Sequence, residues 1–88
     1  MFNHKDIRLL NDSYFTRIRT EEDFIEIKSK NTKHCWLIKK IPGSVHLYHK
    51  HKITNPYYHK HRTVFNVSSA ISEIKSHDEY VIKKSSRY

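Results

Sequence analysis

Hydrophobic residues near the start of the chain recur with the spacing of a helix. Ile7, Leu10, Tyr14 and Ile18 lie three or four positions apart, and most residues between them are polar. Side chains at this spacing fall on one face of an α-helix. The pattern therefore predicts an amphipathic helix over residues 5–18.

The following segment, Asp23–Lys28, is compatible with two structures. Ile25 and Ile27 alternate with polar residues as in a half-buried strand, whereas Thr20 followed by Asp23 resembles a helix-capping box. The β-branched residues are typical of strands, and the polar residues 30–32 supply a turn after them. We therefore expect a strand here.

Three further strands are indicated in the middle of the chain. His34–Ile41 is predicted to be a buried strand, and Ser44–His51 alternates apolar and polar residues as a strand does. Pro42–Gly43 between them suits the central positions of a type II turn, in which glycine accepts a positive φ angle. Asn55–Pro56 interrupts the chain, and Tyr57–Phe65 is expected to form the next strand.

Helical spacing returns in the C-terminal part of the chain. Asn66 is a favourable N-cap residue. After it comes an apolar stripe typical of a helix that buries one face, made by Val67, Ala70, Ile71 and Ile74. We expect this helix to end near His77. Tyr80–Ile82 is expected to form a short strand or to pack on the core, and residues 83–88 to form a mobile basic tail.

Together these elements predict one α+β domain over residues 1–82. The expected architecture has two layers: an antiparallel sheet of three to four strands, a C-terminal helix packed on one face of it, and an N-terminal helix beside it. A chain of 88 residues suits one small hydrophobic core. The opposite face of the sheet, or the edge formed by its last two strands, is then free to present polar groups.

Charge is distributed unevenly along the chain. The formal net charge is +8. Residues 27–72 contain no Asp or Glu, and they hold most of the basic side chains: Lys28, Lys30, Lys33, Lys39, Lys40, Lys50, Lys52, Lys60 and Arg62. Solvated surfaces usually mix both signs of charge. The middle of the chain therefore predicts a cationic surface.

Several classes of protein are excluded by composition. The single cysteine, Cys35, rules out an internal disulfide framework, and the longest apolar run, residues 35–38, is too short to span a membrane. One glycine is too few for the phosphate-binding loops of nucleotide enzymes, and no pair of carboxylates is placed for catalysis. We therefore expect a non-enzymatic protein of the cytoplasm, with no cofactor and no membrane contact.

Basic and aromatic residues alternate over two of the predicted strands. Lysine and arginine neutralise phosphates, and aromatic rings stack on unpaired bases. If the two strands form a hairpin, these residues lie side by side on one ribbon. We expect the ribbon to bind DNA, RNA or a protein–nucleic acid complex, through Lys39, Lys40, Tyr48, His49, Lys50, His51, Lys52, Tyr57, Tyr58, His59, Lys60, His61 and Arg62.

The histidines of this ribbon suggest a second kind of chemistry. His49 and His51 form one His-x-His unit and His59 and His61 another, and residues two apart in a strand share a face. In the same hairpin register, His49 lies opposite His59, which brings four imidazoles within reach of one zinc ion. The surrounding cations and the absence of a nearby carboxylate oppose this, so exposed histidines without metal are the favoured interpretation.

A third interpretation is cleavage of RNA without a metal. The strand Gly43-Ser44-Val45-His46-Leu47-Tyr48 is similar to the Gly-Ser-His strand of the HicA mRNA-interferase toxins. The resemblance covers about residues 34–77 and implies that His46 acts as catalytic base. Loss of RNA cleavage on replacing His46 or His59 by alanine would test this interpretation. Val45 stands between the serine and the histidine here, whereas the family has the two adjacent.

The C-terminal two-thirds also resembles small proteins of phages and mobile elements in AT-rich bacteria. The segments that carry this likeness are Trp36, Leu47–His51, Tyr58–His59, Ala70–Ile71 and Ile74–Val81. The resemblance implies a bacterial host and a role in host takeover, replication control or counter-defence. The alternative function is an inhibitor that docks on a host or defence protein, as anti-CRISPR proteins do. An exposed edge strand would also allow two copies to pair as a homodimer.

Overall fold

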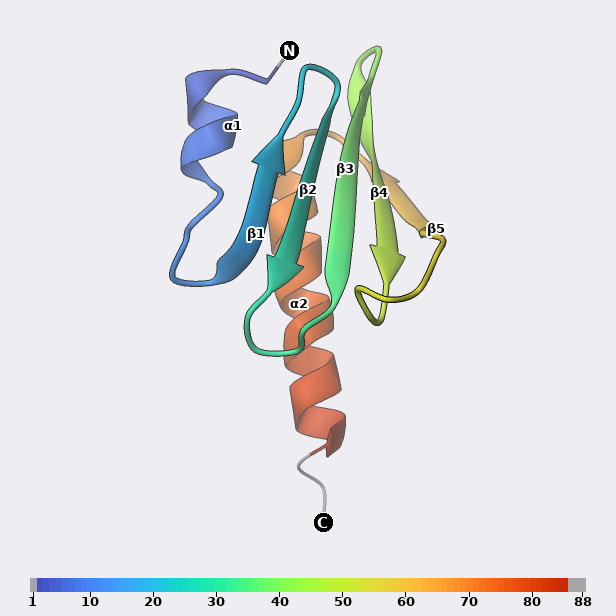
Figure 1. Ribbon diagram of the computed structural model, residues 1–88. Coiled ribbons are helices and arrows are strands. Elements are labelled where there is room, and N and C mark those ends of the chain that lie inside the picture. Colours follow the sequence, from blue (N-terminus) through green and yellow to red (C-terminus); the bar gives the residue numbers. More distant parts are fainter. Residues whose placement is uncertain (1, 86–88) are drawn as a thin grey trace.

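The computed structural model describes residues 2–85 and folds them into one antiparallel sheet with two helices (Figure 1). The short helix α1 (His4–Arg8) precedes the sheet, and the long helix α2 (Val67–Ser85) follows it. Over these residues the sheet has five strands in sequence order: β1 (Phe15–Thr20), β2 (Phe24–Ser29), β3 (Cys35–Ile41), β4 (Ser44–Lys50) and β5 (His59–Val64). The α+β class is confirmed, and the sheet has five strands where three to four were expected.

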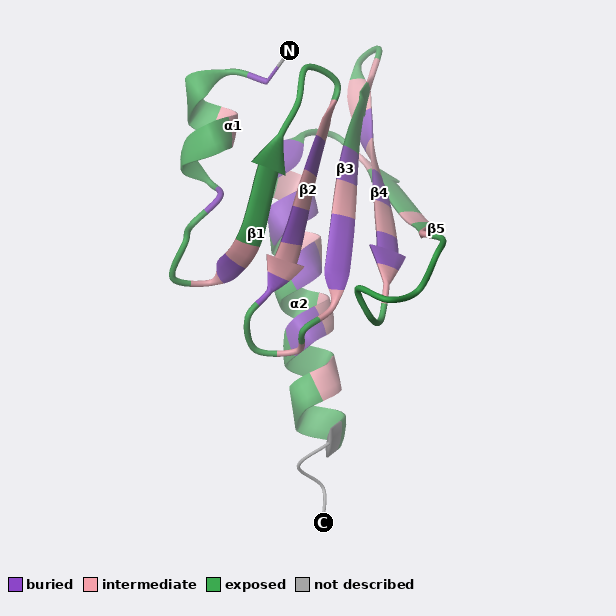
Figure 2. Ribbon diagram, in the orientation of Figure 1, coloured by how far each residue is buried: buried purple, intermediate pink, exposed green. Residues whose placement is uncertain are grey.

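Helix α2 packs on one face of the sheet and creates the core there (Figures 1 and 2). Its residues Val67, Ile71 and Ile74 are buried against a row of fully buried sheet residues, Ile25, Ile38 and Leu47. Residues opposite each other in an antiparallel pair share a face. The pairings of Ile25 with Ile38 and of Ile38 with Leu47 therefore define the helix-covered face. The other face is called the open face below.

The predicted strands and turns in the middle of the chain are confirmed, except that the last strand runs from His59 to Val64 and leaves Tyr57, Tyr58 and Phe65 outside it. The strand expected at Asp23–Lys28 corresponds to β2, whose buried residues alternate. Gly43 has a φ of +77°, as the type II turn requires. The Asn66 side chain accepts a hydrogen bond from the Ser69 amide at 2.9 Å, so it caps α2 as expected.

The predicted N-terminal helix over residues 5–18 is wrong. Only His4–Arg8 is α-helical, with a capping box between Asn3 and Asp6. A turn at Asn11, whose carbonyl accepts from the Tyr14 and Phe15 amides, then leads into β1. Phe15 is 1% exposed and pairs with Ser29 on β2. The long-range gain from burying Phe15 beside β2 outweighs the local helical spacing.

The C-terminal helix is longer than expected. It continues past His77 through Ser85, so Tyr80–Ile82 is helical rather than a strand. Residues 83–85 of the predicted tail belong to this helix, and residues 86–88 lie outside the described residues. Neither α1 nor α2, the helices of the described chain, combines the length and apolarity that a membrane span requires.

Candidate functional site

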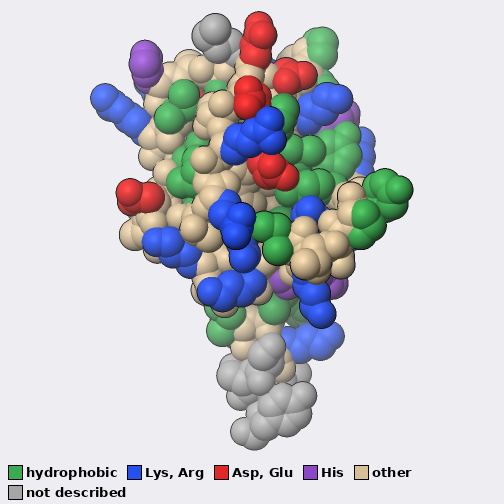
Figure 3. All heavy atoms as spheres, viewed as in Figure 1, with side chains coloured by type: hydrophobic (Ala, Val, Ile, Leu, Met, Phe, Trp, Pro, Cys, Tyr) green, Lys and Arg blue, Asp and Glu red, His purple; other side chains and the backbone are tan. Residues whose placement is uncertain are grey.

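The open face is built from cross-strand rows of polar and basic side chains. The strand pairings place three rows on it: Phe24, Lys39, His46 and Thr63; Arg19, Glu26, Leu37, Tyr48 and Lys60; and Thr16, Lys28, Cys35 and Lys50. Figure 3 looks at this face and shows Lys and Arg side chains spread over it, with most visible carboxylates toward one end. The alternation of strand side chains produces this face directly from the polar half of each strand.

A β-bulge in β1 adds two arginines to the open face. Thr16 pairs with Lys28 and Arg19 with Glu26, so β1 has one more residue than β2 over this stretch. Arg17 sits in the bulge with a φ of 52°, a left-handed conformation that is unusual outside glycine. With this extra residue in β1, Arg17 and Arg19 both line a pocket on the open face.

That pocket lies on the open face, and basic residues outnumber acidic ones in its wall. Its volume is about 300 Å³. The basic side chains in its wall are Arg17, Arg19, Lys28 and Lys50, and Glu26 is the carboxylate among the lining residues. Tyr58 and Ile53 from the β4–β5 loop form an apolar part of the wall. A concave site with converging cations suits an anionic group such as a phosphate.

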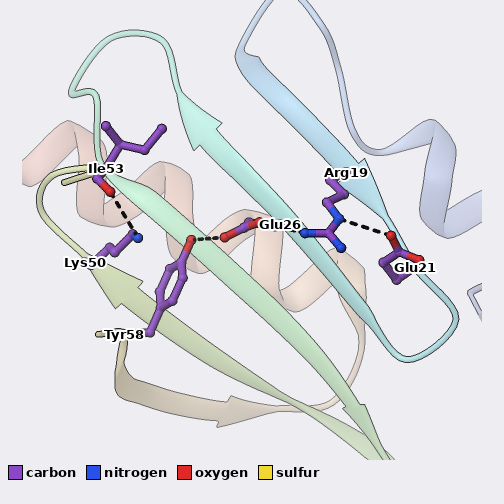
Figure 4. A network of polar contacts seen from close by, with 6 residues as sticks. All are labelled: Arg19, Glu21, Glu26, Lys50, Ile53 and Tyr58. Atoms are coloured by element: carbon purple, nitrogen blue, oxygen red, sulfur yellow. Dashed lines mark hydrogen bonds and ion pairs between the residues drawn. The ribbon is translucent and has the colours of Figure 1, made fainter. Parts of the chain in front are cut away.

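The carboxylates around this pocket are already engaged by neighbouring side chains (Figure 4). Glu26 accepts a hydrogen bond from the Tyr58 hydroxyl at 2.8 Å and lies 3.9 Å from the Arg19 guanidinium. Glu21 pairs with Arg19 at 3.1 Å. Burial raises the pKa of the Tyr58 phenol, and the bond to Glu26 acts in the same direction, so Tyr58 remains the donor.

Lys50 and Tyr58 fix the β4–β5 loop over the open face. The Lys50 ammonium donates to the carbonyls of Ile53 at 3.3 Å and Asn55 at 3.1 Å, and it lies 4.6 Å from the centroid of the Tyr58 ring. Cys35 is buried beneath this loop, and burial raises the pKa of its thiol. A thiol held in its protonated form is a poor nucleophile.

The residues of the predicted ribbon do not share one surface. Lys39, Tyr48, Lys50, Tyr58 and Lys60 belong to the open face, as the cross-strand rows and the contacts of Tyr58 place them. Lys52 and Tyr57 are exposed in the β4–β5 loop. The others lie on the helix-covered side, by pairing or by contact: Lys40, His49, His51, His59, His61 and Arg62.

This division corrects the expectation of a single cationic and aromatic ribbon, and it has two physical causes. Strand alternation alone sends His49 to the face opposite its neighbours Tyr48 and Lys50. In addition, β5 contains a bulge. Leu47 and Tyr48 are adjacent on β4, but their partners on β5, Arg62 and Lys60, are two positions apart. Arg62 is thereby shifted to the helix-covered face, where it pairs with Glu73 on α2 at 3.1 Å.

Histidines gather at one end of the helix-covered face. The expected pairing of His49 with His59 is confirmed, and their ring centroids lie 5.4 Å apart. His34, just before β3, stacks on His51 with centroids 4.9 Å apart. His77 on α2 completes the group from the helix side, with centroid distances of 4.7 Å to His49 and 5.5 Å to His61.

Three members of this group bring their ring nitrogens together. The potential ligand atoms of His34, His49 and His77 all lie within 4.8 Å of one another, a grouping found among the described residues. His49 is 2% exposed, and its Nε2 lies 2.9 Å from His34 Nδ1. Within residues 2–85, the buried Nδ1 of His77 makes no hydrogen bond. A buried polar atom without a hydrogen bond is costly unless water or a bound ion satisfies it.

The surroundings favour the neutral imidazoles in this group. Burial lowers the pKa of His49 to about 3, and His77 and the other neighbouring histidines act in the same direction. Burial also lowers the pKa values of His34 and His77, while Asp78 opposes the change in both. Neutral imidazoles carry a nitrogen lone pair that can bind a metal.

Asp78 connects the histidine group to the rest of the fold. Its carboxylate has no exposed surface and accepts hydrogen bonds from the hydroxyls of Tyr14 at 2.7 Å, Ser29 at 2.6 Å and Thr32 at 2.9 Å. Thr32 in turn accepts a bond from the His34 amide at 3.3 Å. This network holds the β2–β3 turn against α2 and so brings His34 next to His77.

His46, the predicted base for RNA cleavage, lies apart from the histidine group on the helix-covered face. It belongs to the open face, and its Nδ1 lies 2.8 Å from the Thr63 hydroxyl. His59 lies opposite His49 on the helix-covered side. His46 and His59, the two histidines whose replacement tests RNA cleavage, therefore lie on opposite faces of the sheet.

The sequence interpretation missed five site residues: Arg17, Arg19, Lys28, His34 and His77. His34 and His77 carry a signal, because they are the remaining histidines of the central and C-terminal segments, but only the tertiary fold brings them to His49. Arg17 lies outside the acid-free segment and reaches the pocket through a bulge.

Known proteins were compared with this chain by family, by sequence and by structure. No family model, no curated protein and no solved structure gives a significant match.

Proposed function

We propose that this protein binds nucleic acid, or a protein–nucleic acid complex, through the open face of its sheet. The observation that carries the proposal is the pocket in which Arg17, Arg19, Lys28 and Lys50 converge. A backbone phosphate in this pocket would be surrounded by several cations, while the carboxylates there are already bonded to Arg19 and Tyr58. The remaining charge of the pocket is thus positive.

Further phosphate and base contacts extend from the pocket across the sheet. Lys39 and Lys60 also lie on the open face, and Tyr48 pairs with Lys60 in the row that contains Arg19 and Glu26. Tyr57 at the end of the β4–β5 loop is 83% exposed, so its ring is available to stack on an unpaired base. Stacking of this kind contributes about 1–3 kcal/mol per base. The combination favours a single strand with exposed bases.

The first prediction concerns the salt dependence of binding. Fluorescence anisotropy with labelled single-stranded RNA and DNA of about 20 nucleotides should give a steep fall in affinity between about 50 and 300 mM KCl. Replacing Arg17, Lys28 and Lys39 together by glutamine should reduce the slope of log K against log salt by about 2, because each lost phosphate contact reduces it by about 0.7.

The control variant removes the same charge elsewhere. Lys5→Gln, Arg8→Gln and Lys84→Gln alter both helices and leave the open face intact. Circular dichroism establishes that both triple variants are folded. An affinity that does not change with salt, or an equal loss in the two triple variants, would contradict the proposal.

Docking on a host or defence protein stays a prediction from the sequence. Affinity capture after nuclease treatment distinguishes this function from the proposed one. A complex that forms through nucleic acid is lost on digestion, whereas one through direct protein contact survives. Cleavage of RNA that depends on His46 is tested in the same binding reactions by analysing the length of the oligonucleotide.

A further inference from the structure

We propose that His34, His49 and His77 form a binding site for a first-row divalent metal ion such as Zn²⁺. The site lies on the helix-covered face and is independent of the proposed nucleic-acid contacts on the open face. It joins three segments far apart in the sequence: the β2–β3 turn, the end of β4 and the middle of α2.

The positions of the nitrogen atoms carry the proposal. Zn–N bonds of 2.0–2.1 Å in a tetrahedral site place ligand nitrogens about 3.3 Å apart. Here the three nitrogens lie within 4.8 Å of one another, and His49 Nε2 and His34 Nδ1 are 2.9 Å apart. The His34 and His77 rings are only partly buried, and the site requires them to rotate until their nitrogens reach this spacing.

Binding of the cation would replace an existing hydrogen bond. In the absence of metal, either His34 Nδ1–H or His49 Nε2–H donates a hydrogen bond to the other nitrogen. When both bind the cation, each ring carries its proton on its second nitrogen and offers a lone pair. His77 has a buried Nδ1 without a hydrogen bond among the described residues, and coordination would supply the missing partner.

The charges nearby offset part of the cation's charge. Asp78 follows His77 on α2 and is buried, and Glu73 on the same helix pairs with His61 at 3.2 Å. The sequence interpretation counted no carboxylate near the histidines, and α2 supplies these two. Asp78 also fixes the turn that carries His34, as outer groups do around metal ligands.

The donor set determines which metals the site would take. It consists of imidazoles, because Cys35 pairs with Lys28 and Lys50 on the open face. Imidazole ligands suit Zn²⁺, Cu²⁺ and Ni²⁺ rather than Mg²⁺ or Ca²⁺. With three protein ligands the site leaves a fourth position for water or another ligand.

The second prediction tests this site with the metal alone. The full chain, purified without a histidine tag and treated with chelator, is titrated with ZnCl₂ by calorimetry. We expect one ion per chain and a higher thermal midpoint in its presence. His34→Gln and His77→Gln, both at partly buried positions, should each weaken binding by more than about 100-fold, since even outer-shell losses cost 10–100-fold.

Two control variants make the result specific. His46→Gln, on the open face, should leave zinc affinity unchanged. The double variant His51→Gln and His59→Gln removes the exposed members of the group. It should change zinc affinity by less than about threefold, because neither residue is a ligand in the proposed site and their effects on it are indirect. In NMR spectra, zinc should shift the ring signals of His34, His49 and His77 and not those of His46.

The proposal is overturned by any of three results: no heat of binding with zinc up to millimolar concentration, equal weakening in His46→Gln and His34→Gln, or loss of binding in the double variant alone. The last result would assign zinc to the exposed histidines of β4 and β5. Oligonucleotide binding by the same samples is measured separately, so failure of one proposal does not affect the other.

Discussion

Asp78 is a carboxylate that the fold places fully inside the protein. Hydroxyl donors from β2, from the turn after it and from the segment before β1 satisfy it at 2.6–2.9 Å. Hydrogen bonds to a charged group are stronger than neutral ones, and a buried carboxylate without them would be strongly destabilising. One residue of α2 thus holds three separate parts of the chain in place.

Tyr14 provides the third prediction, because its hydroxyl donates to Asp78 at 2.7 Å. Burial, assisted by this bond, raises the pKa of Tyr14 to about 12. Between about pH 10 and 12 the unfolded chain therefore loses a proton that the folded protein keeps, and the free energy of unfolding falls with rising pH. Below about pH 10 this contribution is constant.

The Tyr14→Phe variant lacks that titration. We expect it to be less stable than the original protein by about 1–2 kcal/mol near pH 7, and the difference to shrink between about pH 10 and 12. Urea unfolding followed by circular dichroism over this pH range measures both values. Tyr57→Phe, at an exposed loop position, should follow the original protein throughout. A difference that stays constant up to pH 12 would contradict this account of Tyr14.

At the scale of the secondary structure elements, α2 is held by its cap as well as by its apolar face. The fourth prediction is that Asn66→Ala lowers the free energy of unfolding by about 1 kcal/mol, because the Ser69 amide loses its acceptor. Asn66→Ser keeps a capping oxygen and should recover most of this loss. Equal stability of the two variants in urea unfolding would show that the cap makes no contribution.

The elements differ in how far the sequence predicts them. The strands β2, β3 and β4 are predictable because their alternation and turn residues are local signals. At the N-terminus, Ile7, Leu10, Tyr14 and Ile18 imitate one helix although they belong to a helix, a loop and a strand. The contact that decides the structure there is between Phe15 and Ser29, which no local pattern contains.

The candidate site was predictable to a similar extent. The opposition of His49 and His59 follows from the hairpin, and the basic character of the central segment follows from its composition. The bulge that moves Arg62 to the other face, and the approach of His34 to His77, depend on register and tertiary packing. These are properties of the assembled sheet and helix.

At the scale of the whole molecule, the sheet separates two chemical environments. One face presents lysine, arginine and tyrosine to solvent, and the other holds the apolar core with the histidine group at its end. The fifth prediction uses this separation. A bound oligonucleotide should protect Lys28, Lys39 and Lys60 from acetylation by a lysine-reactive ester, because phosphates would occupy their ammonium groups.

Lys5 and Lys84, which belong to the two helices, serve as internal controls in the same sample. Mass spectrometry of the digested protein gives the degree of modification at each lysine. Uniform protection of all five residues, or protection of the helix lysines alone, would place the nucleic acid on a different surface.

The bulges in β1 and β5 have a consequence for self-association. These are the outermost strands of the described sheet, and each carries an extra residue relative to its neighbour. A kinked border offers a poor template for an incoming strand, and natural proteins use this device against fibril growth. We therefore expect the bulges that aim Arg17 and Arg62 also to disfavour extension of the sheet into neighbouring molecules.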